Sequence, residues 1–271
     1  MINKIAHLGD IHIRKLSDRH QEYREVFSRL YDDLKEEKPD RIVVAGDIYD
    51  NFIDLEGEAL ILVGEFITNL SNIADLVLIR GNHDIMKKNK TRVDTIETVT
   101  TLLNNTGVTY YNQSGFYVDE NVTWVVWDYV DGINPWKHYK KRNTKDKFYI
   151  DLYHNPVNGC SLYNGMKMEG KYPKISDFKA HISMFAEIHL RQFFKNRTKA
   201  FCGSLLQQDF GESIENHGYL LWDIEKGIVK EKNIHNDYKF VNVVIDKDTD
   251  YDNLKLPTEL EKNEKTKVKI K

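Results

Sequence analysis

The chain has 271 residues, of which 41% are hydrophobic and 11% aromatic, and a formal net charge of −3 at pH 7. This composition supports a large hydrophobic core and excludes an intrinsically disordered protein. The small net charge excludes nucleic-acid binding through bulk charge, although local basic clusters can still provide it. Cys160 and Cys202 lie far apart, which excludes a disulfide framework and a Cys-x-x-Cys zinc site and favours a reducing compartment. No stretch has the pattern of a signal peptide or the length of a membrane span, so we expect a cytoplasmic protein without a membrane partner.

Strand-like and helix-like segments alternate in the first part of the chain. Short apolar runs at residues 1–8, 41–45 and 75–79 predict buried strands. Apolar residues at helical spacing predict amphipathic helices over residues 19–38, 55–70 and 92–105. This alternation is typical of parallel strands in a sheet that is covered by helices.

The second part of the chain contains mostly strand-like runs, with few helices between them. We expect strands at 108–111, 115–118, 123–127, 148–153, 180–185, 199–202, 219–222 and 240–245. They predict a second sheet packed on the first, which makes an α/β fold: a layered sandwich of two mixed sheets flanked by helices. We expect one domain over residues 1–212, then closing strands and a short or truncated cap over 213–257. Residues 258–271 are charge-rich and predict a polar flexible tail.

The functional signal is a set of polar side chains that follow buried strands. Gly81-Asn82-His83-Asp84 comes directly after the strand at 75–79, and comparable side chains end other strands, namely Asp10, His12, Asp47, His154, Glu187 and His189. Ligands of α/β sheets bind beyond the carboxyl ends of strands, so these side chains can converge on one crevice. They are the ligand types of Mg²⁺, Mn²⁺, Fe²⁺ and Zn²⁺, and they are too many for one ion. Two cations roughly 3.5–4 Å apart can clamp the attacking and leaving oxygens of a phosphoryl transfer.

Each of these residues also has a plainer interpretation when it is taken alone. An aspartate such as Asp10 or Asp47 after a strand is typical of a helix N-cap, and a lone histidine is usually structural. The recurrence at successive strand ends favours a shared site instead. We expect the other histidines to be structural, namely His7, His20, His138, His181, His217 and His235.

The order of these motifs resembles that of the calcineurin-like metallophosphoesterases over about residues 1–205. The resemblance rests on Asp10-x-His12, Gly46-Asp47, Gly81-Asn82-His83-Asp84, His154 and x-x-His189. The closing stretch, residues 201–212 followed by His217-Gly218-Tyr219, is similar to that of SbcD-type nucleases, the prokaryotic and viral relatives of the MRE-eleven recombination nuclease. Residues 152–157 are similar to phage-type members, so the cytoplasm of an infected host is an alternative compartment.

The resemblance implies a role for each residue of the set. Asp10, His12 and His189 would hold one metal ion, Asp47 would bridge, and Asn82 with His154 would hold the second. His83 would act near the scissile phosphate, either protonating the departing oxygen or stabilising charge. Asp84 would orient His83 through its far ring nitrogen.

One position departs from the family's pattern. The last motif of the family is usually Gly-His-x-His, whereas this chain has Ala186-Glu187-Ile188-His189. Glu187 can still offer an oxygen, which would favour Mn²⁺, with Mg²⁺ as the alternative, over Zn²⁺. A second site that is weakened or not filled is the other interpretation. Ala186 in place of glycine can restrict the turn.

Basic residues flank the predicted site in the sequence. Lys87, Lys88, Lys90 and Arg92 follow Asp84, while Lys140, Lys141 and Arg142 belong to a lysine-rich run with aromatic neighbours. Such runs are usually solvated surface, but next to a phosphodiesterase site they also suit a nucleic-acid backbone. Arg191, just after His189, is a further candidate for contact with DNA.

These features favour a two-metal DNA nuclease, either an exonuclease or an endonuclease, that acts in repair or recombination. The resemblance implies an SbcC-type coiled-coil ATPase as partner, and a homodimer as a further option. Two alternatives remain: a phosphoesterase acting on small molecules or proteins, and a DNA-binding subunit with weakened catalysis.

Overall fold

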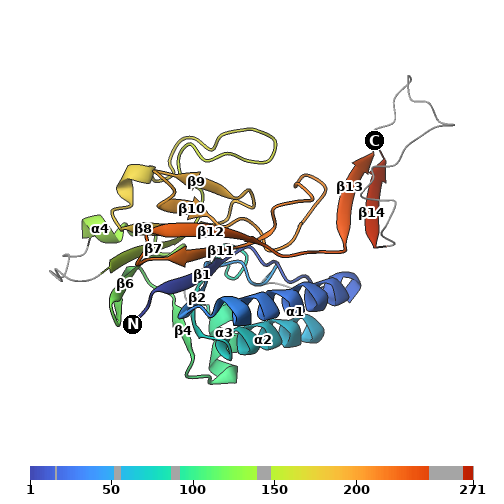
Figure 1. The fold of residues 1–271 in the computed structure, drawn as a ribbon, viewed down its shortest axis with the longest axis horizontal. Helices are drawn as coiled ribbons and strands as arrows, with labels where there is room; N and C mark the ends of the chain where they lie inside the picture. Colours follow the sequence, from blue (N-terminus) through green and yellow to red (C-terminus); the bar gives the residue numbers. More distant parts are fainter. Residues whose placement is uncertain (16, 52–55, 87–91, 139–147, 244–264, 271) are drawn as a thin grey trace.

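The computed structural model describes residues 1–15, 17–51, 56–86, 92–138, 148–243 and 265–270. Most of the described strands belong to one of two six-stranded sheets (Figure 1). In the first sheet β1 to β4 are parallel, and β11 and β12 add antiparallel strands beyond β1. The strand order of this sheet is β12 (Ile228–Asn233), β11 (Gly218–Asp223), β1 (Lys4–Leu8), β2 (Arg41–Val44), β3 (Asp75–Ile79) and β4 (Val108–Tyr111).

Helices α1 (His20–Glu37), α2 (Gly57–Ser71) and α3 (Thr95–Leu103) cover one face of this sheet, below it in Figure 1. They lie close to the predicted ranges. The predicted start of the third helix at residue 92 is wrong, because Asp94 is the N-cap and its carboxylate accepts a hydrogen bond from the Glu97 amide at 2.7 Å. The turn Ser17–Arg19 (η1) precedes α1. None of the described helices is long and apolar enough to cross a membrane.

The second sheet lies on the other face of the first. Strands β6, β7, β8 and β10 are parallel, and β5 and β9 are antiparallel strands at its edges. Short helical segments α4 (Pro135–His138) and η2 (Ile175–Asp177) lie in its connections. The strand order is β5 (Gly115–Asp119), β6 (Val122–Trp127), β7 (Phe148–His154), β8 (Ile182–Ala186), β10 (Lys199–Phe201) and β9 (Gln192–Phe194).

Three apolar clusters hold the layers together. One joins the helices to the first sheet, around Phe27, Phe66 and Leu78. The second lies between the sheets, where alternate side chains of facing strands meet, such as Val43 and Leu152. The third covers the outer face of the second sheet. The predicted sandwich of two mixed sheets flanked by helices is therefore confirmed.

Strands β13 (Lys239–Val243) and β14 (Thr266–Ile270) form a parallel pair that projects beyond the sheets in Figure 1. Within the predicted tail, Thr266–Ile270 pair with β13. Phe240 ties β13 to the closing stretch. Its amide donates to Gln207 Oε1 at 2.8 Å, and its carbonyl accepts from Gln207 Nε2 at 2.9 Å.

Candidate metal centre

The carboxyl ends of the parallel strands of both sheets meet at one edge, where the predicted site residues gather. Asp10 and His12 follow β1, Asp47 follows β2, and Glu187 follows β8; all four have positive φ, between 48° and 92°. A left-handed backbone is unfavourable for residues with a Cβ and persists only where the surroundings impose it. Such residues cluster at functional sites, and here the strained turns aim side chains from separate strands into one place.

Asp47 lies between two groups of potential ligands. Its Oδ2 atom is 3.6 Å from His12 Nε2 and 3.2 Å from His154 Nε2, while its Oδ1 atom accepts a hydrogen bond from the His83 amide at 2.9 Å. Burial alone would raise the pKa of this carboxyl, but His154, His12 and His83 outweigh burial and lower it. A charged carboxylate shared by the two groups has the geometry of a bridging ligand.

The first group consists of Asp10, His12 and His189, whose ligand atoms lie within 4.8 Å of one another. The two Nε2 atoms of His12 and His189 face each other at 3.1 Å. The outer nitrogen of His189, Nδ1, is 2.5 Å from Glu212 Oε1 and donates to that carboxylate, so Nε2 is the nitrogen that a cation could bind. A cation between these nitrogens would satisfy both.

The second group surrounds His154, which is fully buried. Its Nδ1 donates to the Ala45 carbonyl at 2.7 Å, so Nε2 is the nitrogen that a cation could bind. That nitrogen is 3.1 Å from Glu187 Oε2 and 3.3 Å from Asn82 Oδ1, in addition to Asp47. Three oxygen atoms thus surround this nitrogen.

The donor sets of both groups fit divalent cations. Glu187 Oε2 is buried and accepts no hydrogen bond among the described residues, which leaves a carboxylate oxygen directed at His154 without a donor. Oxygen and imidazole ligands of this kind suit Mn²⁺, Mg²⁺, Fe²⁺ or Zn²⁺. All seven predicted ligands therefore lie in one place, and their roles as ligands stay predictions.

Gly81 permits this crowding. A Cβ at residue 81 would lie 2.1 Å from Asp47 Oδ1 and 2.6 Å from His154 Nε2, closer than any real contact. Any other residue would displace the carboxylate that the two groups share.

Ala186 and Glu187, which depart from the family's pattern, have a different backbone arrangement from the one predicted. Ala186 is the last residue of β8, and the left-handed φ of 92° falls on Glu187, so alanine does not restrict the turn. The methyl group of Ala186 packs where Gly9 has none, since a Cβ at residue 9 would lie 2.6 Å from it. The Glu187 amide also donates to both carboxylate oxygens of Asp10, at 3.0 and 3.1 Å. Glu187 therefore links both groups.

The predicted contact between Asp84 and His83 is wrong. Asp84 Oδ2 accepts hydrogen bonds from the amides of Asp47 and Gly81, both at 2.8 Å, and Oδ1 accepts one from the Tyr49 amide at 3.2 Å. Burial and the charge of Asp47 raise the pKa of Asp84 to about 7, although the backbone amides oppose this rise. Asp84 thus holds the turns after β2 and β3 in place.

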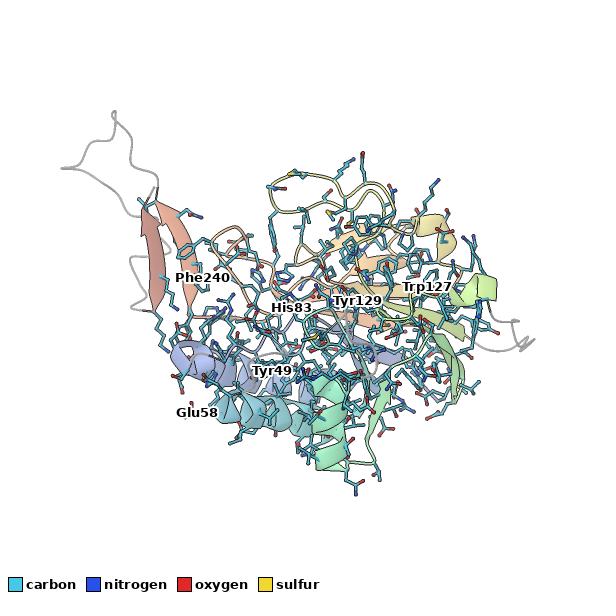
Figure 2. The ribbon with its side chains drawn as sticks, turned by 180° about the vertical axis from the view of Figure 1, so that it is seen from behind. Tyr49, Glu58, His83, Trp127, Tyr129 and Phe240 are labelled. Carbon is cyan, nitrogen blue, oxygen red and sulfur yellow. The ribbon has the colours of Figure 1, made fainter. Side chains whose placement is uncertain are left out.

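Asp50 orients His83 instead. Its carbonyl oxygen is 2.5 Å from His83 Nδ1, and its Oδ1 atom is 3.5 Å from His12 Nδ1. The rings of His83 and His12 lie edge to face, 4.7 Å apart, and Figure 2 shows His83 between the helical layer and the second sheet. The sequence prediction missed Asp50, although its position three residues after Asp47 in the same turn could have indicated it.

Glu212 is the second functional residue that the sequence prediction missed. Besides His189, its carboxylate accepts hydrogen bonds from the Gln208 amide at 3.0 Å and Ser204 Oγ at 3.2 Å. Burial alone would lower the pKa of His189, but the bond to Glu212 raises it to about 9. A carboxylate on the outer nitrogen of a ligand histidine fixes the ring and its tautomer.

Glu212→Gln should weaken metal binding by about 10- to 100-fold, the usual effect of losing such a partner. Titration of the variant with Mn²⁺ by isothermal calorimetry measures this change, and Glu212→Asp should restore part of the affinity. Glu215→Gln is a matched control, because Glu215 is an exposed glutamate of the same segment. Unchanged affinity in Glu212→Gln would show that His189 does not bind metal.

Glu187→His should shift the metal preference of the centre towards Zn²⁺, because imidazole replaces a harder oxygen beside His154. Activity measured with each metal in turn tests this, with Glu187→Gln as the control that removes charge and keeps shape. The same dependence on Mn²⁺ in all three proteins would exclude Glu187 from the metal's surroundings.

The predicted DNA-binding residues differ in where the structure places them. The side chain of Arg191 is only 4% exposed, and it donates to the Cys202 carbonyl at 3.0 Å and Asn233 Oδ1 at 2.7 Å. These hydrogen bonds hold Arg191 in the protein, and its contact with DNA stays a prediction. Arg92 is exposed and lines a cavity near Arg80. The other predicted contacts lie outside the described residues, namely Lys87, Lys88, Lys90, Lys140, Lys141 and Arg142.

Arg14 is a cation beside the centre that the sequence prediction did not single out. Its Nη2 donates to the Gln208 carbonyl at 2.7 Å, and its Nε lies 4.0 Å from Asp50 Oδ1. The side chain is about one-third exposed, at 34%. It is therefore held beside Asp50, whose carbonyl contacts His83, and stays partly exposed.

Comparisons with known proteins agree with this geometry. The family model for calcineurin-like phosphoesterases matches residues 3–189. The uncharacterized protein R555 of Acanthamoeba polyphaga mimivirus is 35% identical over 260 residues, which cover 90% of this chain and 19% of R555. The chain thus spans about one-fifth of the length of that relative.

Two solved structures are also similar. TT1561 of Thermus thermophilus aligns with a TM-score of 0.54 and 9% identity, covering 87% of this chain and all of that one, which indicates a shared fold. The nuclease MPE of Pseudomonas putida aligns over 59% of this chain and 65% of its own, with 16% identity and a TM-score of 0.32, too low to bear on the fold or the substrate. Because the family model spans most of the chain, including every predicted metal ligand, the protein belongs to the calcineurin-like phosphoesterase family.

Proposed function

We propose that this metallophosphoesterase is a nuclease that hydrolyses phosphodiester bonds of DNA in repair or recombination, with two divalent cations, preferably Mn²⁺. The observation that supports it most is the position of Asp47 Oδ2 between His12 and His154, with His83 adjoining. This arrangement suits two cations on either side of one carboxylate. Phosphodiester hydrolysis is the chemistry that such a pair serves.

The cations would activate a water molecule and neutralise charge on the phosphate when bound. The chain's own residues do the rest. Asp84 fixes the turns that carry Asp47 and Gly81. The Asp50 carbonyl accepts a hydrogen bond from Nδ1 of His83, so that Nε2 of His83 can face the departing oxygen. Arg14, which lies beside Asp50, would contact a phosphate oxygen of the substrate.

Two basic runs favour DNA over a small phosphoester. Residues 87–92 follow Asp84 directly, and the run at 137–147 precedes the strand that ends in His154. The first run therefore adjoins the site along the chain, whereas the second joins the amino end of β7, at Phe148, and His154 lies at the carboxyl end of that strand. Basic side chains beside the site would attract the phosphates on either side of the scissile bond.

A cleavage assay on end-labelled duplex and single-stranded DNA, with Mn²⁺, Mg²⁺ and Zn²⁺ in turn, tests the proposal. We expect cleavage with Mn²⁺, and DNA binding that weakens with salt. Neutralising Lys140, Lys141 and Arg142 together should weaken binding and leave hydrolysis of bis(p-nitrophenyl) phosphate unchanged. Hydrolysis of that small ester without cleavage of any DNA would favour a small-molecule phosphoesterase, and metal binding without hydrolysis of either would favour a DNA-binding subunit.

An SbcC-type coiled-coil ATPase and a second copy of this chain are the partners that we propose for the nuclease. Co-purification of the chain with such an ATPase, and its mass in solution by light scattering, test the two interactions separately.

A further inference from the structure

A cavity of about 330 Å³ opens beside the candidate metal centre. Its walls come from three segments: the loop after β7, the turn after β8 that carries Glu187 and His189, and the closing stretch. None of the residue roles described above involves a ligand in this cavity. The lining residues that the loop and the closing stretch contribute are Leu162, Tyr163, Asn164, Asp209, Gly211 and Glu212.

The loop after β7 is tied down around Tyr163. Leu162 and Met166 are joined by a backbone hydrogen bond of 2.8 Å, and the Gln192 side chain both accepts from and donates to the backbone of Ser161, at 2.9 and 3.0 Å. The Tyr163 hydroxyl donates to the His189 carbonyl at 3.3 Å. The tyrosine ring is thus anchored on the backbone of a predicted metal ligand.

The chemistry of the walls suits a flat, uncharged ring with polar edges. Leu162, Ile188 and Leu190 contribute apolar groups to the lining together with Tyr163, while Asn164 offers an amide. Asp209 adds negative charge, which disfavours a second phosphate there. A volume near the lower end of ligand cavities, about 300–1,000 Å³, takes one nucleoside rather than a base pair.

We propose that this cavity receives the unpaired base of the nucleotide next to the scissile phosphate, and that Tyr163 stacks on it. The inference rests on the proposed nuclease function and makes it more specific. A base bound there must leave its duplex partner, so the enzyme should prefer single strands or frayed ends. Sequence preference should be weak, because every base has a stacking face.

The test combines a change in the substrate with a change in the protein. Single-stranded DNA that carries one abasic residue on either side of the cleavage position is compared with intact DNA, using wild type and Tyr163→Ala. For wild type we expect the abasic residue at one of these positions to lower kcat/KM by about 5- to 100-fold, the range of base–aromatic stacking. Tyr163→Ala should lower kcat/KM for intact DNA by a similar factor. In this variant the abasic residue should lower kcat/KM little further.

Two further variants separate the ring from the fold of the loop. Tyr163→Phe should keep most of the discrimination, because it retains the stacking face. Met166→Ala should behave as wild type, because Met166 is an exposed residue of the same loop, outside the cavity wall. The Mn²⁺ content of each variant shows whether the metal centre is intact.

Additive effects of the abasic residue and Tyr163→Ala would overturn the proposal, as would wild-type indifference to abasic DNA. If wild type cleaves no DNA at all but hydrolyses bis(p-nitrophenyl) phosphate, the proposed nuclease function itself is wrong. DNA cleavage without this coupling leaves the nuclease intact and refutes only the base site.

Discussion

Asp47→Asn should empty both metal positions and abolish hydrolysis. Asp47 Oδ2 lies between His12 and His154, so each group of ligands loses the same negative oxygen when the carboxylate becomes an amide. Loss of an outer partner already costs about 10- to 100-fold in metal affinity, and loss of a shared ligand should cost more. Mn²⁺ content after gel filtration, measured by mass spectrometry, should fall from the two ions per chain that the proposed mechanism requires to fewer than one.

The control for this experiment is Asp32→Asn, which removes a carboxylate that is 74% exposed on α1. It should keep both ions and full activity. If Asp47→Asn retains one tightly bound ion and measurable turnover, then Asp47 belongs to one group of ligands only, and the two-metal mechanism must be replaced by a one-metal mechanism.

His83→Ala should leave the metals in place and lower kcat by about 10²- to 10⁴-fold, the usual contribution of an acid–base or charge-stabilising side chain. The amide of His83, rather than its ring, donates to Asp47 Oδ1, so the alanine variant keeps that hydrogen bond. The ring is held by the Asp50 carbonyl, which fixes where its other nitrogen points. Single-turnover rates and Mn²⁺ content together test this.

His83→Gln is a second variant that tests the role of His83, since glutamine keeps a hydrogen-bonding group without acid–base chemistry. Its kcat should also fall, while KM changes little. A loss of Mn²⁺ from either variant would contradict the assignment and make His83 a ligand or a support of one.

Much of the fold could be predicted because its elements have strong local signals. Helices α1 and α2 have apolar stripes at helical spacing, and β1 to β3 are short apolar runs that end in glycine and acidic residues. The gathering of Asp10, Asp47 and His154 could be predicted because parallel strands have their carboxyl ends at the same edge.

The contacts that orient the ligands could not be predicted in the same way. Glu212 meets His189 across 23 residues of chain, and nothing in the local pattern pairs them. Arginine is a residue type that often contacts DNA. The direction of the Arg191 side chain, however, is set by its hydrogen bonds to Cys202 and Asn233, which lie on other segments. Asp84 follows His83 directly in the sequence, yet its oxygens turn towards backbone amides of its own turn and of the turn after β2. Such partners depend on packing, which a single sequence does not display.

Each group of ligands draws on both sheets. Asp10, His12, Asp47 and Asn82 extend from the first sheet, and His154, Glu187 and His189 from the second. Bound cations would therefore cross-link the two sheets, which otherwise contact each other mainly through apolar side chains at their shared interface. Sliding of one layer over the other would then break metal coordination before it exposed much of that interface, so the centre would also report whether the two halves of the chain have docked correctly.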